Sequence, residues 1–203
     1  MRLRMNAVQF NPPWGVPERK RGTVEAALAR SQHNREKIAI VSDENERGRY
    51  AITHYEVREP LPRANPMACL VQCELETGRT HQIRVHMAHI GHPLVSDLLY
   101  APGFATKINK LPAELAETIR TLGRQALHAA ELGFEHPVSG DELTFESPLP
   151  ADLERLQDAL NPSWVQILLH GGHAIADAQT IVRSASFLGV QIESKIALPR
   201  IFP

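Results

Sequence analysis

The sequence has no long hydrophobic run and only two cysteines among its 203 residues. No apolar stretch approaches the roughly 18–20 residues that a membrane-spanning helix needs. The positively charged start meets Pro12, Pro13 and Trp14 before the apolar segment of a secretion signal can develop. These absences exclude an integral membrane protein, and we expect a cytoplasmic one.

The two cysteines indicate reduced thiols and no disulfide. Cys69 and Cys73 lie in an alternating segment that predicts a strand over residues 67–76, with Val71 and Leu75 on the same face. At about 3.3 Å per residue, the two sulfurs stand roughly 13 Å apart, which is too far for a disulfide. We therefore expect both thiols to be buried and free.

Several catalytic motifs are also missing. The sequence contains no Walker A loop, no Rossmann glycine fingerprint, no nucleophile elbow and no HExxH motif. Four histidines crowd one region, His81, His86, His89 and His92, and the second and third are spaced i, i+3. That spacing suits zinc, but no third ligand has the matching helical phase. We expect no metal, and histidines that are hydrogen-bonded or exposed.

The composition is that of a soluble globular protein with one sizeable core. Apolar residues make up 43% and charged residues 22% of the chain, and the formal net charge is −1. The distribution is uneven, because residues 1–37 hold eight Lys or Arg against three Asp or Glu, which leaves about −6 on the rest. A basic arm before an acidic body is common in nucleic-acid binders, but it does not identify a partner.

Periodicity predicts most of the secondary structure. Two alternating segments, 50–59 and 67–76, read as strands of a long hairpin. Ile83, Met87 and Ile90 form a helical stripe, for which Thr80 is the expected N-cap and Gly91 the stop. Further helices are expected at 112–122 and 151–160, two strands of a hairpin at 126–135 and 142–146, an irregular arm at 1–22 and a polar turn at 42–49.

Two segments have no clear period. Residues 23–29 fit neither the helical nor the strand period, so both alternatives stay open. From Asn161 onward the charged fraction drops, since the last 43 residues hold only five charges. We leave this final segment unassigned.

The segment Glu76–Met87 carries the most chemical information. It reads as a strand end, a Gly turn, and a helix whose first turn carries Arg79, His81, Gln82 and Arg84. A helix N-terminus presents unpaired N–H groups and partial positive charge, which suits a phosphate or a carboxylate. Arg84 lies beside the apolar stripe, where a guanidinium needs an anionic partner. The alternative is an ordinary arginine in a structural salt bridge.

The same segment resembles the signature of the RluA/RluD-type pseudouridine synthases. The resemblance rests on Leu75–Met87 followed by Gly91-His92-Pro93-Leu94 and Asp97. It extends from about residue 14 to residue 160, through Trp14-Gly15-Val16-Pro17, Gly22-Thr23-Val24, Ala51–Tyr55, Leu127-His128-Ala129, His136-Pro137, Gly140 and Ser147–Pro150.

The resemblance implies an α+β fold with a mixed, largely antiparallel sheet, flanking helices, and RNA across a central cleft. The family isomerises uridine to pseudouridine in RNA without a metal or an organic cofactor. A catalytic aspartate attacks a nucleotide that has left its stack, and basic residues hold the flanking phosphates. The partner implied for this chain is therefore RNA, of ribosomal origin.

The resemblance also assigns site residues. Arg84 corresponds to the arginine that pairs with the catalytic aspartate and holds it ionised. Arg79 and His81 correspond to the pocket edge, with Gln82 beside them, and Leu127 to a position near the target base. The expected RNA-binding or uridine-binding residues are therefore Arg79, His81, Gln82 and Leu127.

The chain departs from the family in two ways. The His-Arg-Leu-Asp motif that carries the catalytic aspartate belongs upstream of Trp14, and we expect this chain to be a truncated form without it. Ser96 replaces the usual glycine before Asp97, which strains a turn that needs positive φ.

These departures set the expected domain organisation and the alternatives. We expect an irregular basic arm at 1–13, a partial catalytic domain at 14–160, incomplete at its N-terminus, and an extension without family resemblance at 161–203. Whether the chain is an enzyme stays open. It is either an inactive part of a synthase, a synthase with another carboxylate, or a non-catalytic RNA-binding module.

Overall fold

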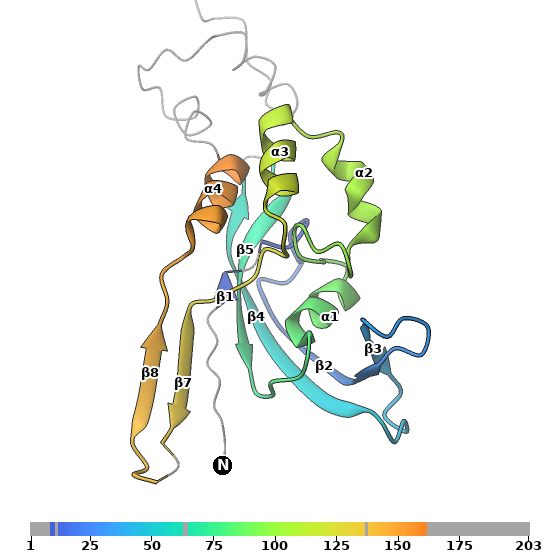
Figure 1. Ribbon diagram of the computed structural model, residues 1–203, viewed down its shortest axis with the longest axis vertical. Helices are drawn as coiled ribbons and strands as arrows, with labels where there is room; N and C mark the ends of the chain where they lie inside the picture. Colours follow the sequence, from blue (N-terminus) through green and yellow to red (C-terminus); the bar gives the residue numbers. More distant parts are fainter. Residues whose placement is uncertain (1–8, 11, 63–64, 137, 162–203) are drawn as a thin grey trace, which may run out of the picture.

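The computed structural model describes residues 9–10, 12–62, 65–136 and 138–161. Its centre is a four-stranded antiparallel sheet of order β3-β2-β4-β5, with α1 against one face and α3 and α4 gathered at one end (Figure 1). The strands are β2 Arg21–Arg30, β3 Ile38–Val41, β4 Arg49–Leu61 and β5 Ala68–Leu75.

The remaining elements surround this sheet. The helices are α1 Gln82–His89, the short η1 Pro102–Phe104 and α2 Ala105–Ile108, α3 Ala113–Thr121 and α4 Ala151–Leu160. Two further antiparallel pairs are formed by β1 Gln9–Phe10 with β6 His128–Ala129, and by β7 Glu131–Glu135 with β8 Glu142–Glu146. The fold is thus α+β, as expected. No helix among the described residues is long and apolar enough to cross a membrane.

The strand over 23–29 resolves the alternative that periodicity left open. β2 pairs with β3 on one side and β4 on the other, and Ala26 to Ala29 are all at most 9% exposed. Because both faces of this central strand are covered, its burial does not alternate, which is why the period was unreadable.

The expected long hairpin is confirmed, with the two cysteines buried. β4 pairs with β5 from Thr53 opposite Leu75 to Leu61 opposite Ala68, with one irregularity after Val57. Cys69 and Cys73 are both fully buried and unbridged. They belong to a core cluster with Ile83 and Met87 of α1, which fixes this helix on the sheet.

Part of the expected arm is integrated into the body. Trp14 is 5% exposed in a core cluster with residues of α3 and α4. Its N–H donates to the Pro93 carbonyl at 2.9 Å, and the next N–H, of Gly15, donates to the Met67 carbonyl at 2.7 Å. The expectation of an irregular arm over 1–22 is therefore wrong at its end, because buried Trp14 and the strand from Arg21 fix it. The extension 161–203 lies outside the described residues except Asn161.

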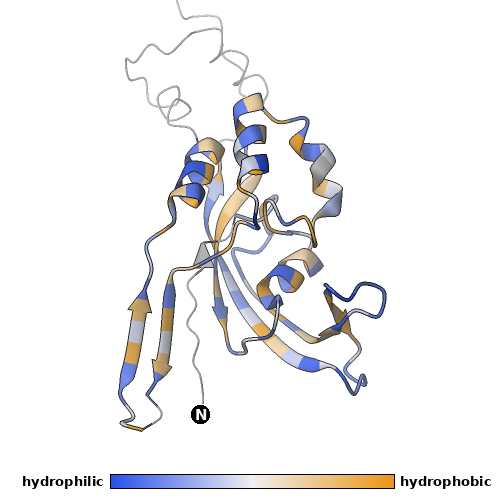
Figure 2. Cartoon of the chain, viewed as in Figure 1, coloured by the Kyte–Doolittle hydropathy of each residue, from blue (hydrophilic) through white to orange (hydrophobic). Residues whose placement is uncertain are grey.

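The predicted C-terminal hairpin is present and extends away from the helices (Figure 1). The predicted strand 126–135 is divided, because β6 pairs with β1 and β7 with β8. Hydrophobic and hydrophilic residues alternate along β7 and β8 (Figure 2). Leu132 lies opposite Phe145 and Phe134 opposite Leu143, so one face is apolar.

Ser96 adopts the strained conformation that the sequence indicated. Its φ is 60°, in the left-handed region where glycine is normally preferred. The Ser96 hydroxyl donates to the Ile119 carbonyl at 3.2 Å and ties this turn to α3. The turn places the next residue, Asp97, beside α1.

Candidate RNA-binding site

The site is built where β5 turns into α1, and Gln82 holds this turn together. Its amide nitrogen donates to the Ile52 carbonyl at 2.8 Å and to the Thr53 hydroxyl at 3.0 Å. Its amide oxygen accepts from the Thr77 hydroxyl at 2.9 Å and from the Arg79 N–H at 3.0 Å. Gln82 is only 3% exposed, so it stabilises this turn from inside the protein.

The observed N-cap of α1 differs from the predicted one. The helix begins at Gln82, and its N-cap is His81, which has φ 55° and ψ 16° and forms no side-chain cap. Thr80 is therefore not the cap. The side chain of Gln82, the first residue of the helix, takes over part of the capping role, because its amide oxygen accepts a hydrogen bond from the Arg79 N–H.

Arg84 is held by Asp97. The Arg84 Nε donates to Asp97 Oδ2 at 2.7 Å and its Nη2 to Oδ1 at 2.8 Å, with side-chain exposures of 11% and 0%. This bond to Asp97 raises the pKa of Arg84. The structure therefore supplies the carboxylate of the salt bridge that was the alternative for Arg84.

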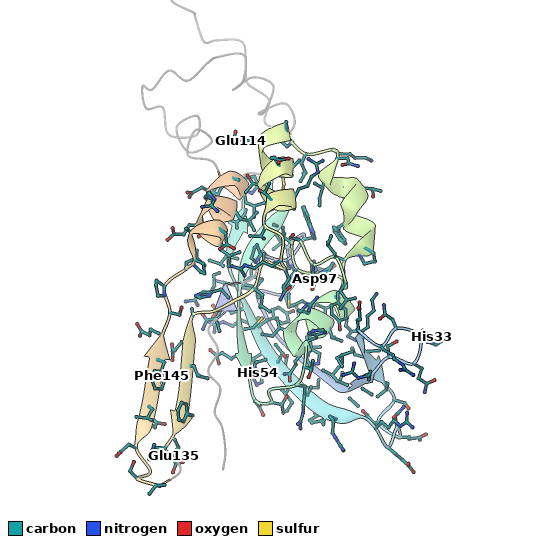
Figure 3. The ribbon with its side chains drawn as sticks, in the orientation of Figure 1. His33, His54, Asp97, Glu114, Glu135 and Phe145 are labelled. Carbon is teal, nitrogen blue, oxygen red and sulfur yellow. The ribbon has the colours of Figure 1, made fainter. Side chains whose placement is uncertain are left out.

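Both carboxylate oxygens of Asp97 accept hydrogen bonds within the protein. Besides the Arg84 fork, Oδ1 accepts from the N–H groups of Leu99 at 3.1 Å and Tyr100 at 3.0 Å. Figure 3 places Asp97 beside α1, and its side chain is fully buried. A buried carboxylate with four hydrogen bonds is a structural anchor and a poor nucleophile.

Tyr100 joins the residues of the site. The Arg84 guanidinium lies 4.9 Å from the centre of the Tyr100 ring, and Lys37 Nζ lies 6.0 Å from it. The Tyr100 hydroxyl lies 3.0 Å from His81 Nδ1, and the two rings meet edge to face at 5.6 Å. Burial, followed by the charge of Arg84, lowers the pKa of His81.

Positive charge dominates this part of the surface. The charge of Arg30, at the end of β2, also lowers the pKa of His81, and Lys37 enters from the loop before β3. Arg79 is exposed, with its Nε directed to the Tyr50 carbonyl at 3.3 Å. Among the described residues, Asp97 is the carboxylate bonded to Arg84, and the other cations of this surface could attract an anionic ligand.

Leu127 lies apart from these cations. It is half-buried against the core cluster that includes Ile83 and Met87 of α1. Its carbonyl accepts from Arg124 Nη1 at 3.0 Å, while Arg124 forks onto Asp152 at 2.8 and 3.0 Å. The structure thus joins Arg79, His81, Gln82 and Arg84 at the start of α1, and places Leu127 on the packed side of that helix.

The remaining histidines do not form a metal centre. His86 is fully buried with Nδ1 at 2.9 Å from the Thr53 hydroxyl, and His92 Nδ1 lies 2.9 Å from the Trp14 carbonyl. Among the described residues, no group of three His, Cys, Asp or Glu could hold a metal ion.

Sequence reasoning missed two members of the site, Tyr100 and Lys37. They come from loops that are far from α1 along the chain, and neither loop has a periodic pattern. A signal existed only for Asp97, which belongs to the motif that carries the resemblance.

Comparison by sequence identifies related proteins. A profile described as RNA pseudouridylate synthase matches residues 6–89. Ribosomal large subunit pseudouridine synthase D of Zymomonas mobilis is 47% identical over 135 residues, which cover 66% of this chain and 39% of that protein. The same-named protein of Xanthomonas campestris is 47% identical over 140 residues, covering 68% of this chain and 39% of that protein. The chain spans about two fifths of these relatives.

Comparison by structure identifies the same fold. Human RNA pseudouridylate synthase domain containing 1 superposes with a TM-score of 0.58 at 22% identity, covering 90% of this chain and 66% of that one. Human RNA pseudouridylate synthase domain containing 4 gives a TM-score of 0.53 at 22% identity, over 75% of this chain and 60% of that one.

Proposed function

The chain belongs to the RluA/RluD type of the RNA pseudouridylate synthase family, and from this premise we propose that it binds structured RNA at the start of α1. The relatives are named as pseudouridine synthases of the ribosomal large subunit, so we take ribosomal RNA as the substrate class and the cytoplasm as the location. The reaction class is the isomerisation of uridine to pseudouridine, with no metal and no organic cofactor.

The observation that carries the RNA-binding part is the excess of cations around Tyr100. The charged groups of Lys37 and Arg84 meet this ring beside the neutral His81, and Asp97 neutralises only Arg84. The Nη1 of Arg84 has no hydrogen-bond partner among the described residues and is not enclosed. A phosphate, or a carboxylate brought to this place, would find a free donor there.

The geometry of Asp97 argues against this residue as the nucleophile. A nucleophilic aspartate needs a free oxygen facing the nucleotide, and both oxygens of Asp97 are occupied inside the protein. We propose that Arg84 serves a carboxylate other than Asp97, and that the chain, without it, binds RNA and does not turn it over.

Incubation of the purified chain with ribosomal RNA, followed by mapping of pseudouridine, tests this assignment. Retention of RNA without new pseudouridine is the expected result. Robust turnover would show that a carboxylate of this chain is the nucleophile, and a scan of Asp→Ala variants would then identify it.

The alternative, a non-catalytic RNA-binding module, makes the same first prediction for the interface. Arg79→Ala should weaken RNA binding and reduce the slope of log affinity against log salt by about 1, because one phosphate contact is lost. The matched control is Arg21→Ala, an exposed arginine paired with Glu56 on β4, which should leave the slope unchanged. Equal slopes for Arg79→Ala and the parent chain would remove Arg79 from the interface.

A further inference from the structure

The hydroxyl of Tyr100 is bonded on two sides. It accepts from the N–H of Ile38, the first residue of β3, at 2.8 Å. It also lies 3.0 Å from Nδ1 of His81, which ends the turn before α1. Tyr100 therefore connects the edge strand of the sheet to the start of the helix.

The protons on these groups limit how the bond to His81 can be made. A backbone N–H only donates, so the hydroxyl oxygen is the acceptor towards Ile38. The single hydroxyl proton can then point to His81 Nδ1, and in that arrangement the nitrogen accepts. If Nδ1 donated instead, the hydroxyl proton would have no acceptor among the described residues. The first arrangement uses every group.

The surroundings favour a neutral imidazole. Arg84 and Arg30 bring positive charge close to His81, and its ring is partly buried. A neutral imidazole that accepts at Nδ1 carries its proton on Nε2. In this form His81 offers an N–H donor at the site without adding a charge.

We propose that Tyr100 is a positioning residue. Its hydroxyl fixes His81 in the Nε2–H form, so that His81 donates to an oxygen of bound RNA, and its ring supports the Arg84 guanidinium. The RNA part of this inference rests on the proposed function. The part that concerns His81 is a property of the free protein.

The first experiment uses the free protein. The nitrogen resonances of the His81 imidazole report its tautomer, and the exchange of the Ile38 amide proton reports the other bond of Tyr100. In the parent chain the Nε2–H form should dominate. Tyr100→Phe keeps the ring and removes the hydroxyl, so both tautomers should be populated and Ile38 should exchange faster.

The matched control is Tyr55→Phe. Tyr55 packs against the core cluster of β5 and α1, away from His81, and its substitution should leave the imidazole resonances unchanged. An Nδ1–H form in the parent chain, or the same tautomer in Tyr100→Phe, would overturn the inference.

The second experiment measures RNA affinity at several salt concentrations. Tyr100→Phe should lower the affinity several-fold with an unchanged salt slope, because no cation is lost. Tyr100→Leu also removes the ring under Arg84 and should lower it further. A changed salt slope in Tyr100→Phe would indicate that the loop that carries Lys37 has moved. That result would contradict a positioning role through His81. If the parent chain binds no RNA, the proposed function fails, and the tautomer measurement still decides the role of Tyr100.

Discussion

At the scale of single residues, the Arg84–Asp97 pair dominates the site. Two parallel hydrogen bonds join the groups, and the carboxylate is fully buried. Removing one charge of such a pair leaves the other buried without compensation, which commonly costs 3–5 kcal/mol. Arg84 thus contributes to stability as well as to the proposed binding.

Asp97→Asn should therefore lower the free energy of unfolding by about 3 kcal/mol or more. Urea denaturation of the variant and the parent chain measures this difference. The control is Glu56→Gln, which breaks an exposed pair with Arg21 and should cost less than about 1 kcal/mol. Similar small losses in both variants would show that the buried pair is not an anchor.

His86 gives a prediction about pH. It is fully buried, and burial together with the nearby charge of His89 lowers its pKa to about 4. His86 Nδ1 lies 2.9 Å from the Thr53 hydroxyl, which also accepts from the Gln82 amide. His86 Nε2 is buried and has no hydrogen-bond partner among the described residues, so the charged imidazole is unfavourable there.

The free energy of unfolding should fall as the pH drops from about 6.5 towards about 4. In this range His86 becomes protonated in the unfolded chain but not in the folded chain. This difference lowers the free energy of unfolding by at most about 3 kcal/mol. Urea denaturation at a series of pH values checks this, with His86→Gln as the comparison because its amide does not titrate. Parallel curves for the two chains would contradict it.

At the scale of elements, the β7–β8 hairpin differs from the rest of the fold. β7 and β8 contact chiefly each other. Their apolar face carries Phe134 and Phe145, stacked at 5.8 Å, and Phe145 is 54% exposed. The opposite face pairs Glu131 with Glu146 and Glu135 with Glu142, which opposes strand pairing. A two-stranded hairpin of this kind is marginally stable.

Phe145→Ala should open this hairpin without unfolding the body. The amide protons of residues 131–135 and 142–146 should lose protection against exchange, while those of β4 and β5 keep it, and Tm should change little. Thr144→Ala, on the opposite face, is the control and should have no effect. A fall in Tm that matches the loss of protection would show that the hairpin and the body unfold together.

Elements with one buried face could be predicted from the sequence. β4, β5, α3 and α4 were expected close to their observed bounds, because each alternates between core and solvent. β2 could not be distinguished, since consecutive residues Ala26–Ala29 are buried on both faces of the sheet. The start of α1 was misplaced because the amide of Gln82, and not a cap at Thr80, satisfies the turn.

At the scale of the whole molecule, charge is segregated. The cations Arg30, Lys37 and Arg79 lie near the start of α1, whereas residues 125–154 contain no Lys or Arg. A groove of about 340 Å³ between α3 and α4 is lined by three carboxylates, of Glu114, Glu117 and Asp152, and by one cation, Arg155. RNA is therefore expected at the α1 end, away from the hairpin and this groove.

The resemblance led to the residues at the start of α1, but it could not give their contacts. Arg84 meets Asp97, thirteen residues later, and Tyr100 meets Ile38 across 62 residues. Such long-range polar contacts leave no periodic trace in a sequence. The sequence therefore predicted residues of the candidate site, and the hydrogen-bond network that joins them could be read only from the fold.

The two buried thiols of β5 have a kinetic consequence. Burial, and next the neighbouring Cys73, raises the pKa of Cys69 to about 12, so almost no thiolate exists at neutral pH. An alkylating reagent needs a thiolate within reach. Modification should therefore wait for β5 to leave the core, and its rate should report how often the sheet opens. If β5 leaves as one unit, mass spectrometry should show the doubly modified chain without an accumulating singly modified one.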